Sequence, residues 1–141
     1  MKGILAFLSG IGLGLAVLYG CNKASEGAKE VSFKVKFKAY DTKIDSATIE
    51  GFTIRNVRQL NVINEPSDLV VRVGNKVNVE LINESPISEN FSIEGYGVNT
   101  TLKPQETAKV SFTADRPGAY TIWCNLYPKN IHLPGSFVVV E

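Results

Sequence analysis

The chain has 141 residues, of which 44% are hydrophobic and 21% are charged, a composition typical of one globular domain. Beyond the first twenty residues, which contain Lys2 and no acid, it has 14 basic and 14 acidic residues and therefore no net charge. This neutral body lacks the basic excess that favours nucleic acids, so we expect no nucleic-acid partner.

Residues 1–20 are predicted to be a signal peptide, with Lys2 followed by seventeen uncharged residues from Ile4 to Gly20. The run that ends at Gly20 and Cys21 resembles a bacterial lipobox. That resemblance implies cleavage before Cys21 and a lipid on its sulfur. The alternative is an uncleaved membrane anchor, for which seventeen residues are at the short limit. Both interpretations predict a periplasmic, extracytoplasmic body tethered to a membrane.

A polar spacer over residues 21–30 precedes the first alternating pattern. From Val31 onward, lysines alternate with apolar residues, which predicts a strand with one solvated face. We expect a turn at residues 39–43 and a second strand at 48–57. Residues 31–58 are therefore predicted to form an N-terminal β-hairpin extension.

Residues 59–141 are predicted to form the main domain. Short apolar runs are separated by turn residues, and no helical pattern of useful length interrupts them. The expected strands cover residues 60–64, 69–73, 77–82, 91–93, 107–112, 119–124 and 136–140. Recurring short strands with turns between them predict an all-β sandwich or barrel.

The chemistry of the chain centres on Cys124 and His132. The sequence has two cysteines and one histidine, so a lipid on Cys21 would leave Cys124 without an intrachain disulfide partner. Cys124 ends a predicted strand, and His132 follows eight positions later in a loop. Thiolate and imidazole are ligands that copper favours. The spacing alone fits a buried cysteine beside an exposed loop histidine equally well.

Three segments resemble the copper domain of cytochrome oxidase subunit II and nitrous oxide reductase. They are Phe112–Gly118, Trp123–Cys124 and Val138–Val140. The resemblance implies a cupredoxin-like Greek-key β-sandwich. Pro128 stands at the position of the second cysteine of that pattern, Gly135 at the methionine and Glu89 at the upstream histidine. A binuclear copper site is therefore not expected.

The nitrosocyanin family of red copper proteins is the more similar one, over roughly residues 38–141. The segments that carry this resemblance are Asn64–Pro66, Ser85–Glu89, Phe91–Ile93, Phe112–Asp115, Thr121–Cys124 and Pro128–Gly135. That family binds one copper ion through a glutamate, a cysteine and two histidines. The resemblance implies Glu89, Cys124 and His132 as ligands, one copper per chain, and a homotrimer held partly by the hairpin. Tyr127 stands where the other histidine belongs.

Tyr127 leaves three alternatives. In the first, Tyr127 binds the metal as a phenolate, because a bound cation favours the deprotonated form of a phenol whose ordinary pKa is near 10. In the second, Tyr127 only lies beside a site with three protein ligands. In the third, the chain no longer binds a metal. The aromatic residues near the site, Phe91, Tyr96 and Trp123, are expected to pack in the core.

Three functions follow from these alternatives. A closed site favours redox chemistry, with electron transfer to an unknown redox protein. An open coordination position favours an enzyme or sensor that binds a small molecule such as nitric oxide. The third function is copper binding or assembly, although the chain has only Met1 and His132 in place of the usual methionine and histidine clusters.

Overall fold

A computed structural model describes residues 28–141. The leader, the lipidation site at Cys21 and most of the spacer lie outside the described residues, so these assignments stay predictions. Among the residues that are described, no helix has the length and apolar character needed to cross a membrane.

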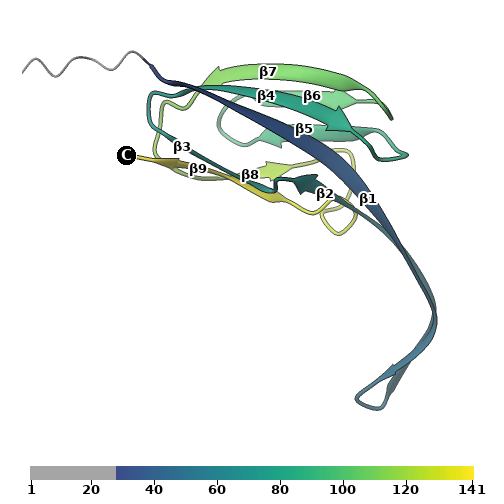
Figure 1. Ribbon diagram of the computed structural model, residues 1–141. Coiled ribbons are helices and arrows are strands. Elements are labelled where there is room, and N and C mark those ends of the chain that lie inside the picture. Colours follow the sequence, from purple (N-terminus) through teal and green to yellow (C-terminus); the bar gives the residue numbers. More distant parts are fainter. Residues whose placement is uncertain (1–27) are drawn as a thin grey trace, which may run out of the picture.

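Nine strands between residues 28 and 141 form two sheets that pack face to face (Figure 1). The strands are β1 (Glu30–Ile49), β2 (Phe52–Glu65), β3 (Asp68–Arg72), β4 (Lys76–Asn83), β5 (Glu89–Ile93), β6 (Val98–Leu102), β7 (Thr107–Thr113), β8 (Gly118–Trp123) and β9 (Gly135–Val140). One sheet has the order β2-β1-β4-β7 and the other β3-β9-β8-β5-β6. The β1–β4 and β3–β9 pairs are parallel and the others antiparallel. The predicted all-β sandwich is confirmed.

The core lies between the two sheets. Along β4, every second residue is buried, which is the period of a strand with one covered face. The rings of Phe37 and Phe91, one from each sheet, stack 6.4 Å apart and are fully buried. Burial of each such side chain contributes about 1.5–3 kcal/mol, so these contacts hold the two sheets together.

The hairpin of β1 and β2 is longer than the sequence predicts. The turn expected at residues 39–43 is wrong, because β1 runs through these residues and each pairs with β2. The chain reverses instead at Glu50 and Gly51, whose φ angles of 48° and 84° suit a two-residue hairpin loop. β2 likewise joins two expected strands and crosses residues 58 and 59 without a break. The far end of this hairpin projects beyond the sandwich (Figure 1).

The strand β6 is not among the expected strands. Only its end residues Val98 and Leu102 are apolar, so its pattern is typical of a polar connection that follows the turn with Gly95 and Gly97. Backbone pairing with β5 from Val98 to Leu102 forms the strand nevertheless. Tertiary pairing has overridden a weak local preference here.

The loop between β8 and β9 is fastened to β2. The Val62 N–H donates to the Ile131 carbonyl at 2.7 Å, and the Leu133 N–H donates to the Val62 carbonyl at 2.8 Å. These two bonds form a parallel bridge between Val62 and His132. His132 lies in a loop between two strands of one sheet, and this bridge holds it against the other sheet.

Candidate metal centre

Three side chains from different elements converge at one end of the sandwich. Glu89 begins β5, Cys124 directly follows β8, and His132 lies in the loop before β9. One ligand atom of each lies within 4.8 Å of the others. Their exposed fractions are 0%, 3% and 2%, respectively. The structure therefore brings together three of the four predicted ligands in a site that is closed to bulk water.

The Glu89 carboxylate faces both the imidazole and a supporting hydroxyl. Its Oε2 lies 2.6 Å from Nδ1 of His132, and its Oε1 lies 3.1 Å from the hydroxyl of Ser85. Ser85 is fully buried, so the acid is held at both oxygens inside the protein. An ionised acid at such a depth requires a positively charged partner, which His132 or a metal ion provides.

The pKa of His132 reflects this environment. Burial, the largest effect, lowers it, but hydrogen bonds to Cys124 and Glu89 and their negative charges outweigh burial and raise the pKa from 6.5 to about 9. The imidazole of the metal-free protein is therefore cationic at neutral pH. A metal ion that binds at Nδ1 must displace a proton.

Tyr127 is half-buried on the same loop. Its pKa is raised, mainly by burial and then by the negative charges of Glu89 and Cys124, so its hydroxyl is protonated without a metal. It lines a groove together with Leu60, Ile87 and Ile131. Metal binding by Tyr127 stays a prediction.

Asn64 is a site residue that the sequence reasoning missed. It is 3% exposed, and its Oδ1 lies 2.9 Å from Nε2 of His132. The signal was present in the sequence, because Asn64 shares a strand face with the buried Val62 and interrupts an apolar alternation. A polar residue at an inward position of a strand indicates a buried hydrogen-bonding role.

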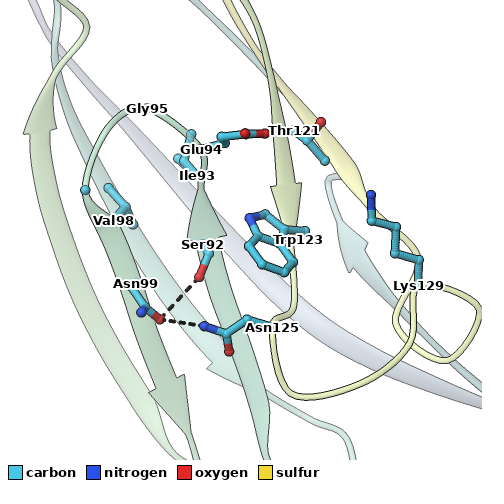
Figure 2. Close-up of a pocket in the computed structure, with 11 residues that line it drawn as sticks. Ser92, Ile93, Glu94, Gly95, Val98, Asn99, Thr121, Trp123, Asn125 and Lys129 are labelled. Carbon is cyan, nitrogen blue, oxygen red and sulfur yellow. Dashed lines mark hydrogen bonds between the residues drawn. The ribbon is translucent and has the colours of Figure 1, made fainter.

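The expected place of Trp123 in the core is wrong. Along β8 the buried Ile122 and Cys124 point inward, so Trp123 points outward and is 36% exposed. Trp123, Asn125 and Lys129 line a groove of about 630 Å³. Figure 2 shows their side chains. Phe91 is in the core, and Tyr96 packs against the core cluster, as expected.

Residues 11–139 match the family model of the cupredoxin-like domain. The chain belongs to the cupredoxin-like domain family. The expected cupredoxin-like fold is thereby confirmed.

Relatives of this cupredoxin-like domain include nitrous-oxide reductase and cytochrome c oxidase subunit 2. It is 36% identical over 66 residues to nitrous-oxide reductase of Cupriavidus necator, covering 45% of this chain and 10% of the relative. It is 33% identical over 79 residues to cytochrome c oxidase subunit 2 of Thermus thermophilus, covering 55% of this chain and 58% of that one. A copper-containing nitrite reductase of Thermus scotoductus superposes with a TM-score of 0.58 and 24% identity over 79% of this chain and 28% of its own. The chain thus spans about a tenth to three fifths of these curated relatives.

The donor set of the cupredoxin-like domain fits a transition-metal ion. Cys124 offers a soft thiolate, His132 an imidazole and Glu89 a carboxylate, all within 4.8 Å. Thiolate with imidazole suits copper and zinc, whereas magnesium and calcium prefer oxygen ligands alone. Burial of all three side chains excludes competing water, which strengthens the attraction between the donors and a cation.

Proposed function

We propose that this domain is a mononuclear copper protein that transfers electrons, with Glu89, Cys124 and His132 as ligands and Tyr127 as the fourth. The observation that carries this proposal is the convergence of a buried thiol, imidazole and carboxylate within 4.8 Å. Copper supplies a one-electron redox couple when bound. Among residues 28–141 the one thiol is that of Cys124, and Pro128 stands where a bridging thiolate would be needed, so we expect one ion.

The closed site favours electron transfer over catalysis. Each of the three clustered ligands is at most 3% exposed, and the loop that carries His132 is bonded to β2 on both sides of that residue. A rigid, closed site changes little in geometry between oxidation states. The Trp123 ring, one peptide bond from Cys124, is exposed and offers a short route from the ligand to a partner protein.

A second candidate function follows from the groove beside Tyr127. Leu60, Ile87 and Ile131 line this groove together with Tyr127 itself. If Tyr127 is a wall and not a ligand, a small molecule such as nitric oxide could reach the metal from this side. The domain would then be an enzyme or sensor with an open coordination position.

Visible and electron paramagnetic resonance spectra of the Cu(II)-loaded chain, recorded beside Tyr127→Phe and Cys124→Ser, test these alternatives. We expect strong charge-transfer absorption that is lost in Cys124→Ser and shifted in Tyr127→Phe. Absorption that Tyr127→Phe leaves unchanged would favour the open site. No stoichiometric copper and no charge-transfer band would overturn the copper proposal altogether.

The proposed location is outside the cytoplasm, with the chain tethered to a membrane. The evidence is the apolar segment from Ile4 to Gly20, followed by Cys21, which resembles an exported lipoprotein leader. A lipid on Cys21 would hold the chain at the membrane through its acyl chains, whereas an uncleaved anchor would hold it through the apolar segment itself. Labelling of the expressed chain with a fatty acid, with Cys21→Ser as control, separates the two forms of attachment.

We also propose that copies of the chain associate through the projecting hairpin, as the resemblance to the nitrosocyanin trimer implies. Phe52 and Ile49, which face each other across the hairpin, are 81% and 60% exposed. An isolated two-stranded hairpin is at best marginally stable in water, and exposed apolar clusters mark interaction surfaces. A second copy of the chain would cover these side chains.

A further inference from the structure

The two ring nitrogens of His132 have chemically different neighbours. Nδ1 faces Oε2 of Glu89 at 2.6 Å, on the side of the proposed metal. Nε2 lies 2.9 Å from Oδ1 of Asn64, an amide oxygen that only accepts hydrogen bonds. Both Asn64 and His132 are nearly fully buried, so water does not substitute for either partner.

We propose that Asn64 is a positioning residue that fixes the tautomer of His132. By accepting the Nε2–H bond, it keeps the proton on Nε2 and leaves Nδ1 as the nitrogen that binds the metal. This inference rests on the proposed metal centre. A hydrogen-bond partner on the second ring nitrogen orients a ligand histidine, and its loss commonly lowers metal affinity.

The surroundings leave the imidazole little freedom to turn. Phe37 is paired with Asn64 across β1 and β2, and its ring meets the imidazole edge-on at 5.6 Å with an interplanar angle of 68°. The two backbone bonds of Val62 hold the loop on either side of His132. Asn64 therefore lies in β2, the strand that also holds the loop, and its amide faces the His132 ring in a defined orientation.

A purely structural role for Asn64 is a competing explanation, and the chain contains a matched control for it. Asn61, on the same strand, donates from Nδ2 to the Asn130 carbonyl at 2.7 Å. It anchors the loop without touching His132. Asn61→Leu therefore removes a side-chain bond between the same strand and the same loop, whereas Asn64→Leu removes the bond to the imidazole.

The test is ¹⁵N NMR of the imidazole in the full chain, because His132 is the one histidine in the sequence and gives a single set of signals. In the diamagnetic Zn(II)-loaded protein we expect a metal-bound Nδ1 and a slowly exchanging proton on Nε2. Asn64→Leu should give fast exchange at Nε2 and a metal affinity lower by roughly 10- to 100-fold. Asn64→Asp, which keeps an acceptor at the same place, should restore both, and Asn61→Leu should leave both near the wild-type values.

The outcomes separate this inference from the proposed function. A wild-type chain that binds neither Zn(II) nor Cu(II) would overturn the metal centre itself. A metal-loaded wild-type chain whose Nε2 is bound to the metal, or lacks a proton, would overturn the role of Asn64 even if no variant folds. Equal losses in Asn64→Leu and Asn61→Leu would reduce Asn64 to a loop anchor.

Discussion

At the scale of single residues, Gly135 shows how tightly the end of the loop between β8 and β9 packs against the segment that follows β2. A Cβ atom at this position would overlap the backbone carbonyl of Ser67, which accepts a hydrogen bond from the Ser136 N–H at 3.0 Å. A side chain here therefore forces two backbone segments apart. The same close approach explains why a methionine ligand has no place at Gly135 in this chain.

We accordingly expect Gly135→Ala to destabilise the protein by about 1–3 kcal/mol or more, the usual cost of an overpacked site. Urea denaturation of the metal-free chain measures the change in free energy of unfolding. Ser136→Ala, which adds no atom near Ser67, is the matched control and should cost less. A Gly135→Ala protein as stable as the wild type would show that the two segments separate freely.

The pKa of His132 predicts how stability depends on pH in the metal-free protein. The folded-state pKa is raised from 6.5 to about 9. The stabilisation is therefore fully present below pH 6.5 and is lost as the pH rises through 9. We expect the free energy of unfolding to fall by on the order of 3 kcal/mol between pH 6 and pH 9.5.

Urea titrations at those two pH values, made on the wild type and on His132→Gln, check this prediction. The variant lacks the titrating group and should lose much less stability over the interval. Equal losses in the two proteins would assign the pH dependence to other groups.

The sequence predicted some residues of the candidate site and missed others. Glu89, Cys124 and His132 were predicted as ligands because the residue types and the resemblance pointed to the same positions, and the structure brings these three side chains together. Metal binding by them stays a proposal. Asn64 could not be assigned a role, since its partner stands 68 positions away in sequence. Trp123 was misplaced because a large aromatic ring suggests the core, whereas strand alternation turns it outward.

At the scale of elements, the hairpin is where local sequence signals were least informative. Residues 39–43 include an aspartate and a lysine, which suggest a turn, but pairing with β2 keeps them in an extended strand. The true reversal depends on Gly51, which accepts a positive φ readily. Cross-strand pairing decides strand length, and it is not visible in a single segment.

The exposed apolar tip of the hairpin, formed by Ile49 and Phe52, predicts self-association. A charged side chain placed at this tip should prevent it. We expect the wild-type chain to sediment as an oligomer and Phe52→Lys to sediment as a smaller species, because a buried lysine would lack a partner at the interface. Thr53→Lys adds the same charge to the opposite face of the strand and is the control. A wild-type chain that stays monomeric at high concentration would contradict the proposed interface.

At the scale of the whole molecule, the proposed metal centre joins the two sheets. Glu89 begins β5 and Cys124 directly follows β8, both strands of one sheet, whereas His132 is bridged to Val62 in β2 of the other. The sequence predicted a sandwich, but not that β2 would brace the loop of the opposite sheet. Glu89 lies 35 positions before Cys124 in the sequence, and the fold brings both side chains within 4.8 Å of His132.

A ligand that binds the folded state alone stabilises it by mass action, by about 2.7 kcal/mol at a hundred times its dissociation constant. For a chain of this size we expect a metal-dependent rise in melting temperature on the order of 10 °C. Calorimetry with Zn(II), which avoids redox chemistry at the thiol, measures the rise. Cys124→Ser should abolish most of it, whereas a rise of equal size in Cys124→Ser would place the bound metal elsewhere on the protein.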